Sequence, residues 1–185
     1  MPRISDKRER LLRSADRLIL GQGFRQTTLA DIAEDSEVPL GNVYYYFKTK
    51  EDICKSIVEN RIESMQALLE KCSEADDPKA RLLQLLDYPL TVRKELTDNG
   101  CPLGTLSYEL SRSEGVLSQS SARLIEVVMN WARQQFEAMG RTDADALALQ
   151  LISNLQGMSL VANALKDPGV VDKMVKRTKD WLQSL

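Results

Sequence analysis

Hydrophobic side chains recur at helical spacing along nearly the whole of this 185-residue chain. In one segment, Leu29, Ile32 and Ala33 fall at positions i, i+3 and i+4, which places them on one face of a helix. Thr28 directly precedes this face, where its hydroxyl can accept an orphan backbone N–H as an N-cap. We find no segment of strand length that alternates between apolar and polar residues. The pattern therefore predicts an all-α protein.

A tight turn and a second short helix are predicted directly after this first one. Residues 36–39 break the first helix, because Pro39 has no backbone N–H and disfavours a helical residue before it. Residues 40–47 then form the second helix, with Val43 and Phe47 at i and i+4 packing against the first. Two short helices joined by a tight turn are typical of the helix-turn-helix motif, whose second helix lies in the major groove of DNA.

Three consecutive tyrosines, Tyr44 to Tyr46, favour a groove-reading role for this second helix. Their hydroxyls can donate to phosphates, and their rings can touch thymine methyl groups. Lys48 and Lys50 follow at positions that can pair with phosphate oxygens. The alternative is that a tyrosine packs between helices and the lysines are solvated. The candidate DNA-binding residues are Thr27, Thr28, Leu40, Gly41, Asn42, Tyr44, Tyr45, Tyr46, Lys48 and Lys50.

The segment from about residue 8 to residue 57 resembles the N-terminal domain of TetR-type (tetracycline-repressor-like) transcriptional regulators. The family commonly has Gly where Glu37 stands, and often His where Tyr46 stands. The resemblance implies a homodimeric repressor that binds a pseudo-palindromic DNA operator and is released by a small molecule. It rests on Gly21-Gln22-Gly23-Phe24, Thr27-Thr28, Asp31-Ile32-Ala33, Gly41-Asn42-Val43-Tyr44, Tyr46-Phe47 and Lys50-Glu51-Asp52.

The rest of the chain, from about residue 59 to 185, resembles the family only in being all-helical and of the right length. We expect a helix-turn-helix DNA-binding domain at residues 1–50, a linker helix from about 50 to 72, and a helical ligand-binding and dimerisation domain at 51–185. The helices expected outside the helix-turn-helix run from Ser5 or Asp6 to Gly21, from Thr49 to about Cys72, from Pro78 to Asn99 with a kink or restart at Pro89, from Cys101 to Leu110, from Ser113 or Glu114 to Met139, from Thr142 or Asp143 to about Lys166, and from Val170 to Leu185.

The penultimate helix, at about residues 142–166, is apolar nearly all round, so it must be covered on every face. The body of its own subunit can cover one side, and a second subunit would cover the other. The resemblance implies that the last two helices form a four-helix bundle across a two-fold axis. The alternative is a helix buried inside a monomer. The candidate dimer-interface residues are Leu151, Leu155, Gly157, Met158, Val161, Val175 and Trp181.

Charge and composition support a DNA-binding regulator over an enzyme. The net charge is −2, but residues 1–50 carry nine Lys or Arg against seven Asp or Glu, and the remainder carries sixteen against twenty. A mildly basic head on an acidic body fits a body that does not touch DNA. The chain has no histidine, no phosphate-binding glycine loop and no Cys-x-x-Cys pair. We therefore expect no catalysis, no cofactor and no metal site.

Cellular location follows from similar considerations. No apolar run reads as a signal peptide or approaches the ~20 apolar residues of a membrane span. Three scattered cysteines suggest reduced thiols. The expected setting is a cytoplasm, with no membrane partner.

The regulatory body is expected to bind a small apolar inducer. Cys101 stands near a helix N-terminus, where the dipole favours a thiolate, so it is also a candidate electrophile or oxidant sensor. The alternative for Cys101 is a small buried residue at a tight turn, and Cys54 and Cys72 favour that role more strongly. A DNA-binding protein with no small-molecule ligand is the third possibility. The candidate pocket residues are Tyr88, Cys101, Tyr108, Met129, Trp131 and Phe136.

Overall fold

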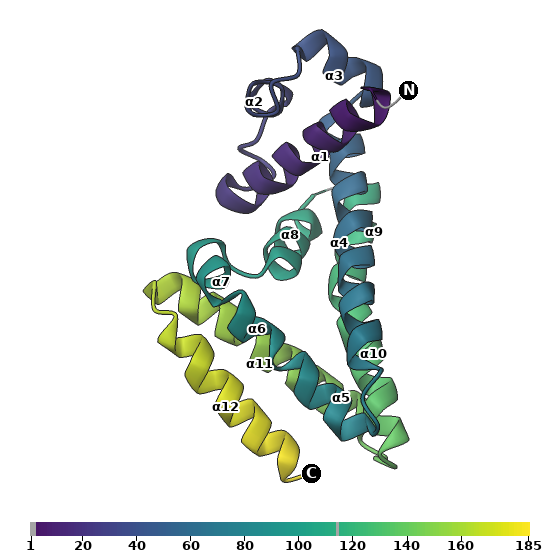
Figure 1. Cartoon of the computed structure of the whole chain (residues 1–185), viewed down its shortest axis with the longest axis vertical. Helices are drawn as coiled ribbons and strands as arrows, with labels where there is room; N and C mark the ends of the chain where they lie inside the picture. The colour runs from purple at the N-terminus through teal and green to yellow at the C-terminus, as the bar shows by residue number, and fades with distance from the viewer. Residues whose placement is uncertain (1–2, 114) are drawn as a thin grey trace. The chain divides into compact units, whose positions relative to one another are not determined.

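The computed structural model describes residues 3–113 and 115–185, and within these ranges it contains twelve helices and no strand (Figure 1). The prediction of an all-α protein is therefore confirmed. Glu114, one of the two proposed starting points for the long helix after residue 113, lies outside the described residues. No helix in the described ranges is both long and apolar enough to cross a membrane.

Two compact units make up the chain, and each is built from separate segments. The first contains the described residues up to Arg61 together with 105–122, and the second contains 62–104 and 123–185. The chain therefore passes between the units three times. The functional division expected at residue 50 stays a prediction.

The first unit holds the helix-turn-helix. Its helices are α1 (Arg3–Gln22), α2 (Leu29–Asp35), α3 (Leu40–Tyr46), the first part of α4 (Lys50–Cys72), the later part of α8 (Pro102–Ser111) and α9 (Val116–Ser121). α2 packs against both α1 and α3.

Side-chain caps define two helix starts in this unit. Thr28 accepts a hydrogen bond from the backbone N–H of Asp31, and the Asp31 carboxylate accepts one from the Thr28 N–H. Thr49 and Asp52 make the same reciprocal pair at the start of α4. Both are capping boxes, which satisfy two orphan N–H groups each. The Thr28 cap is as expected from the sequence.

The second unit is a helical body around an apolar core. Its complete helices are α5 (Pro78–Leu85), α6 (Tyr88–Thr91), α7 (Arg93–Asn99), α10 (Arg123–Ala138), α11 (Ala144–Leu165) and α12 (Gly169–Gln183). α11 packs against α7, α10 and α12. The buried core consists of Leu82, Leu86, Ala132, Phe136, Ala144, Leu147, Ala148, Leu151, Met158, Ala162, Val171, Val175 and Leu182.

The long helix predicted from about residue 113 to 139 is divided in two, and this prediction is wrong. α9 ends at Ser121 and α10 begins at Arg123. The Ser107 hydroxyl donates a 2.8 Å hydrogen bond to the Ser121 carbonyl oxygen. A side chain that engages a backbone carbonyl in this way competes with the helical hydrogen-bond series. Ser107 lies on α8, so nothing in the local pattern of residues 113–139 could have indicated the break.

Candidate nucleic-acid interface

The seven residues of α3 divide into a buried side and an exposed side. Val43 is fully buried, and Phe47, which directly follows the helix, is also buried. Tyr45 points away from this core with 72% of its surface exposed, and Tyr44 is 48% exposed. The division follows from helical periodicity, because positions two residues apart face nearly opposite directions. An unpartnered aromatic face is thus presented to solvent on the second helix of the helix-turn-helix.

The remaining α3 candidates surround this aromatic face. Leu40 and Gly41 are exposed, while Asn42 and Tyr46 are half-buried. A Cβ added at Gly41 would meet nothing within 4 Å, so the backbone there is open to an approaching surface. The rings of Tyr45 and Tyr46 pack edge to face with centroids 5.0 Å apart. Tyr46 therefore supports Tyr45, an arrangement that is favourable for aromatic pairs.

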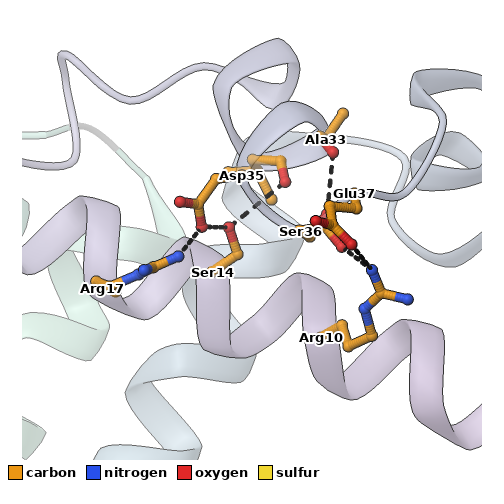
Figure 2. A network of polar contacts seen from close by, with 8 residues as sticks. Arg10, Ser14, Arg17, Ala33, Asp35, Ser36 and Glu37 are labelled. Atoms are coloured by element: carbon orange, nitrogen blue, oxygen red, sulfur yellow. Dashed lines mark hydrogen bonds and ion pairs between the residues drawn. The ribbon is translucent and has the colours of Figure 1, made fainter.

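The turn between α2 and α3 holds a non-glycine residue in a left-handed conformation. Glu37 has a φ of 54°, in the region that favours glycine. Arg10 braces this turn from α1 (Figure 2): its guanidinium donates to the Ser36 carbonyl oxygen at 2.5 Å and to the Glu37 carboxylate at 3.3 Å. A left-handed residue other than glycine costs of order 1 kcal/mol, and these bonds offset part of that cost.

A second set of polar contacts joins α1 to the end of α2. The Asp35 carboxylate accepts hydrogen bonds from the Ser14 hydroxyl and from the Arg17 guanidinium (Figure 2). These two interactions hold the pKa of Asp35 below its usual value, with the Ser14 hydrogen bond as the larger cause. Arg10 and Arg17 of α1 therefore stabilise the helix-turn-helix.

The Thr27-Thr28 pair has structural partners. Thr27 is fully buried, and its hydroxyl donates to the Gly23 carbonyl oxygen at 2.8 Å. The hydroxyl also accepts a hydrogen bond from the Gln22 side chain. Thr28 is exposed, but its hydroxyl is engaged as the α2 N-cap. Of these two candidates, only Thr28 lies at the surface.

The two lysines after α3 differ in the partners of their ammonium groups. Lys48 is exposed and donates to the Tyr44 carbonyl oxygen at 3.0 Å. Lys50 donates to the Phe24 and Arg25 carbonyl oxygens at 2.8 and 3.3 Å, and its Nζ lies 4.4 Å from the centroid of the Phe24 ring. Lys50 therefore holds the turn between α1 and α2 in place. A phosphate contact for Lys50 stays a prediction, and any such contact competes with this structural role.

Glu109 also contacts the turn between α1 and α2, although no sequence pattern indicates this contact. Its carboxylate accepts hydrogen bonds from the backbone N–H groups of Phe24 and Arg25, with N···O distances of 2.8 and 3.4 Å. The same turn is thus held by α8 through its N–H groups and by Lys50 of α4 through its carbonyl groups. Glu109 lies 85 residues from Phe24 along the chain, so no local spacing signals the contact.

The candidate dimer residues fall into two groups. Leu151, Met158 and Val175 are buried in the core of their own unit, and Leu155 and Trp181 pack partly against it. Gly157 and Val161 are exposed. Three further leucines of α11 are exposed, including Leu160 at 69% and Leu165 at 66%. The uncovered apolar surface of α11 consists of Leu149, Gly157, Leu160, Val161, Ala164 and Leu165.

The candidate pocket residues are not brought together into one described cavity. Phe136 is fully buried against the core, with its ring tilted toward Trp181, and Met129 packs partly against that core. Trp131 donates from its indole N–H to the Ser73 hydroxyl at 3.0 Å. Tyr108 belongs to the first unit and is mostly exposed. These placements favour core or surface roles for these four residues, and their role as a pocket lining stays a prediction.

Tyr88 and Cys101 are the pocket candidates that share a location in the second unit. Burial raises the pKa of Tyr88, and the nearby Cys101 raises it further. Cys101 is half-buried, and its Sγ accepts hydrogen bonds from the Gly104 N–H at 3.4 Å and from Gln156 Nε2 at 3.5 Å. A Cβ at Gly104 would lie 2.0 Å from Gln156 Oε1, so glycine is what lets Gln156 reach the thiol.

The other two cysteines are buried. Burial raises the pKa of Cys54 to about 12 and also raises the pKa of Cys72, which disfavours the reactive thiolate at both positions. Among the described residues, no group of three or more histidine, cysteine, aspartate or glutamate side chains is placed to hold a metal ion.

A capped α2, a tight turn and the short helix α3 follow one another along the chain, and α3 has an exposed aromatic face. This arrangement is that of a helix-turn-helix DNA-binding protein. Residues 11–57 match the family described as bacterial regulatory proteins of the tetR family. The chain is 28% identical over 169 residues to the HTH-type transcriptional regulator LmrA of Bacillus subtilis (strain 168), covering 90% of this chain and 85% of that protein.

Solved structures show the same fold over nearly the full length. A TetR transcriptional regulator from Legionella pneumophila superposes with a TM-score of 0.84 at 20% identity, covering 96% of this chain and 95% of the other. The reduced form of Escherichia coli NemR superposes with a TM-score of 0.81 at 21% identity, covering 95% and 96%. Residues 11–57 therefore form a TetR-family domain, and the whole chain is similar in sequence and fold to TetR-family transcriptional regulators. Regulators of this family are generally DNA-binding proteins that are not enzymes.

Proposed function

We propose that this regulator is a repressor that binds a pseudo-palindromic operator as a homodimer and is released by a small molecule. The observation that carries the DNA-binding part is the exposed face of α3. Tyr44 and Tyr45 stand in solvent on a helix whose other side is anchored by the fully buried Val43. Aromatic groups with hydroxyls can contact both sugars and phosphates of a major groove. A two-fold dimer would place two such helices in grooves ~34–36 Å apart, or a multiple of that spacing.

The uncovered face of α11 supports the homodimer. Leu160 is about two-thirds exposed, and the exposed Gly157 and Ala164 lie within about 60° of it around the helix axis. Contiguous exposed apolar surface marks an interaction site, because leaving it in water has a free-energy cost. A second copy of α11 supplies a matching aliphatic face across a two-fold axis, as in other isologous interfaces.

Operator binding is tested with the DNA directly upstream of the coding region, searched for an inverted repeat. In a fluorescence anisotropy titration, the parent protein is expected to bind the labelled duplex, and Tyr45→Ala to bind at least tenfold more weakly. Tyr45 is mostly exposed, so its removal should leave the fold intact, and thermal unfolding checks this. Asn60→Ala, at an exposed position of α4, is the matched surface control. Equal binding by Tyr45→Ala and the parent would refute the role of α3.

Lys48 provides a second test of the same surface. If its ammonium group pairs with a phosphate, Lys48→Ala should weaken binding to all sequences about equally. The slope of log K against log salt should also become shallower by about one unit. Lys50→Ala is a poorer test, since it also removes the bonds from Lys50 to the Phe24 and Arg25 carbonyl oxygens.

Induction requires a ligand that binds two arrangements of the DNA-binding heads with different affinity. α4 and α8 are the helices that pass from one unit to the other without a break. Each helix is hydrogen-bonded to the turn between α1 and α2: Lys50 of α4 donates to the Phe24 carbonyl oxygen, and Glu109 of α8 accepts from the Phe24 N–H. We expect a shift of either helix to move this turn, and with it the spacing of the two α3 helices.

A thermal-shift screen with small apolar compounds tests for such a ligand. A compound that binds the folded state raises the unfolding midpoint by mass action. Compounds that do so are then added to the operator complex, and release of DNA is expected. Glu109→Ala should reduce the release by a stabilising compound while leaving the thermal shift in place. A screen without any stabilising compound would favour a DNA-binding protein with no small-molecule ligand.

A thiol-based release mechanism is the second candidate. It is favoured by Cys101, which is the one cysteine of the three that is not fully buried and which stands at the start of α8. Operator release is followed after thiol alkylation of the parent, Cys101→Ser and Cys72→Ser proteins. Release of the parent and Cys72→Ser, but not of Cys101→Ser, would support a thiol sensor. Equal release of all three, or none of the parent, would contradict it.

A further inference from the structure

The exposed part of α3 carries no charged side chain, which is unusual for a helix that binds DNA. Residues 40–46 contain no arginine, lysine, aspartate or glutamate. The side chains that reach solvent there are an aliphatic group at Leu40, an amide at Asn42, and the phenols of Tyr44, Tyr45 and the half-buried Tyr46. Any direct reading of bases by this helix must therefore use an aliphatic group, an amide or phenols.

Base pairs differ in the groups that they present in the major groove. Guanine is read most often by arginine or lysine at O6 and N7, and the cytosine amino group by aspartate or glutamate. Adenine is read by the paired donor and acceptor of an asparagine or glutamine amide, and the thymine methyl group by apolar side chains. The exposed chemistry of α3 matches the second pair of bases.

The basic residues next to α3 do not change this assignment. Lys48 is assigned to a phosphate in the proposed function, and the ammonium group of Lys50 is bonded to the Phe24 and Arg25 carbonyl oxygens. In contrast, the Asn42 side-chain amide makes no hydrogen bond within the described part of the chain. It keeps both its donor and its acceptor for a base edge.

The backbone beside these groups permits a close approach. Gly41 stands between Leu40 and Asn42, and a Cβ there would meet nothing within 4 Å. Glycine at such a position removes the side chain that would otherwise hold the helix away from the floor of the groove. Short side chains such as Leu40 and Asn42 can then reach base edges.

We propose that α3 reads A·T base pairs, with Asn42 on adenine and Leu40 against a thymine methyl group. The inference rests on the proposed function, in which α3 enters the major groove. It adds the class of operator that the protein selects: half-sites whose central pairs, those under α3, are A·T. Tyr44 and Tyr45 then hold the register through sugar and phosphate contacts.

Selection from a random duplex library with the full-length protein tests the base class. A·T pairs are expected to be enriched at the centre of each half-site. Enrichment of G·C pairs at the centre would overturn the inference and leave the DNA-binding function in place. A library without any enriched sequence would refute both.

Base substitutions in the selected operator test the individual residues. Replacing thymine with deoxyuridine removes only the 5-methyl group, which should weaken parent binding by about fourfold at the position facing Leu40, the change expected for one buried methyl group. Leu40→Ala should bind the thymine and uracil operators alike. If uracil at every half-site thymine left parent binding unchanged, the methyl contact would be refuted, although operator binding would persist.

Asn42→Ala completes the test. The parent should prefer its central adenine over guanine by about tenfold or more, as a bidentate amide contact gives. Asn42→Ala should lose this preference, whereas Asn60→Ala, the matched asparagine control on α4, should keep it. Thermal unfolding of each variant confirms that the fold is retained. An unchanged preference in Asn42→Ala would overturn the adenine contact.

Discussion

The exposed faces of α3 and α11 both place large hydrophobic side chains in water, but their chemistry differs. On α3, Tyr44 and Tyr45 combine rings with hydroxyl groups. On α11, Leu160 and Leu165 carry no polar atom. A nucleic-acid groove is hydrated and lined with phosphates, so a side chain that meets it needs hydrogen-bonding groups. A purely aliphatic face is stabilised only by another apolar surface. In the proposed function both are binding surfaces, and their polar atoms distinguish the proposed partners.

The two faces also differ in how they are supported. α11 packs against three other helices of its own unit, and its inner side is core. α3 is a seven-residue helix that depends on a capped α2, a braced turn and the contacts of α2 with α1. The first support is mainly apolar burial, and the second relies on a small number of polar contacts. The surfaces should accordingly respond differently to charge, to bulk and to acid.

The largest expected effect is that of a charge placed on α11. Leu160→Asp would bury an unpaired carboxylate in the proposed interface, at a cost of about 3–5 kcal/mol. Light scattering should show a monomer where the parent is a dimer, and operator affinity should fall because the half-sites are no longer bound together. Tyr45→Asp is the matched variant on α3. It should abolish operator binding by repelling phosphates while the protein stays dimeric. A dimeric Leu160→Asp protein would refute the α11 interface.

Added bulk at Gly157 should have a moderate effect. A Cβ at this position meets nothing within 4 Å in a single chain, so Gly157→Leu fits the isolated subunit. In a dimer it should overpack the approach of the two α11 helices and weaken association by about 1–3 kcal/mol. Sedimentation at several concentrations would measure the shift. If the parent protein sediments as a monomer throughout, the face has another role.

Gly41→Ala is the corresponding change on α3 and should have a smaller effect on stability. A Cβ again meets nothing within 4 Å. Alanine is favoured over glycine in helices by up to about 1 kcal/mol, so thermal stability should stay the same or rise slightly. Operator affinity should fall, because the methyl group holds the helix away from the groove. Loss of stability together with affinity would show that the residue serves the fold alone.

The smallest expected effect is a loss of stability in acid, which should affect the support of α3 and not that of α11. The pKa of Asp35 is lowered in the folded protein by the Ser14 hydrogen bond and by Arg17. The stability contributed by this carboxylate is therefore complete above its ordinary pKa of 3.8, and it is lost as the pH falls below that value through the folded pKa. Thermal unfolding followed from about pH 4 down to about pH 2 should show a steeper loss for the parent than for Asp35→Asn. Parallel curves would show that Asp35 contributes nothing to the DNA-binding frame.

The sequence by itself determined the local structure of this protein. Thr28 with Asp31, and Thr49 with Asp52, form the capping boxes that their spacing predicts. The periodicity around Val43 correctly separates the buried and exposed sides of α3. Such features are readable because the interacting atoms lie within one or two helical turns of each other. The helical character of the body follows from periodicity for the same reason.

Other features were decided only by the tertiary structure. Thr27 and Lys50 belong to the DNA-reading pattern in sequence, yet their side chains bond to the turn between α1 and α2. Glu109 reaches that turn from α8, and the Ser107 hydroxyl binds the Ser121 carbonyl oxygen where α9 ends before α10. α11 is apolar nearly all round, and only the packing of α7, α10 and α12 decides which of its leucines remain in water. These outcomes depend on which distant groups meet in space, and neither helical periodicity nor capping preference carries that information.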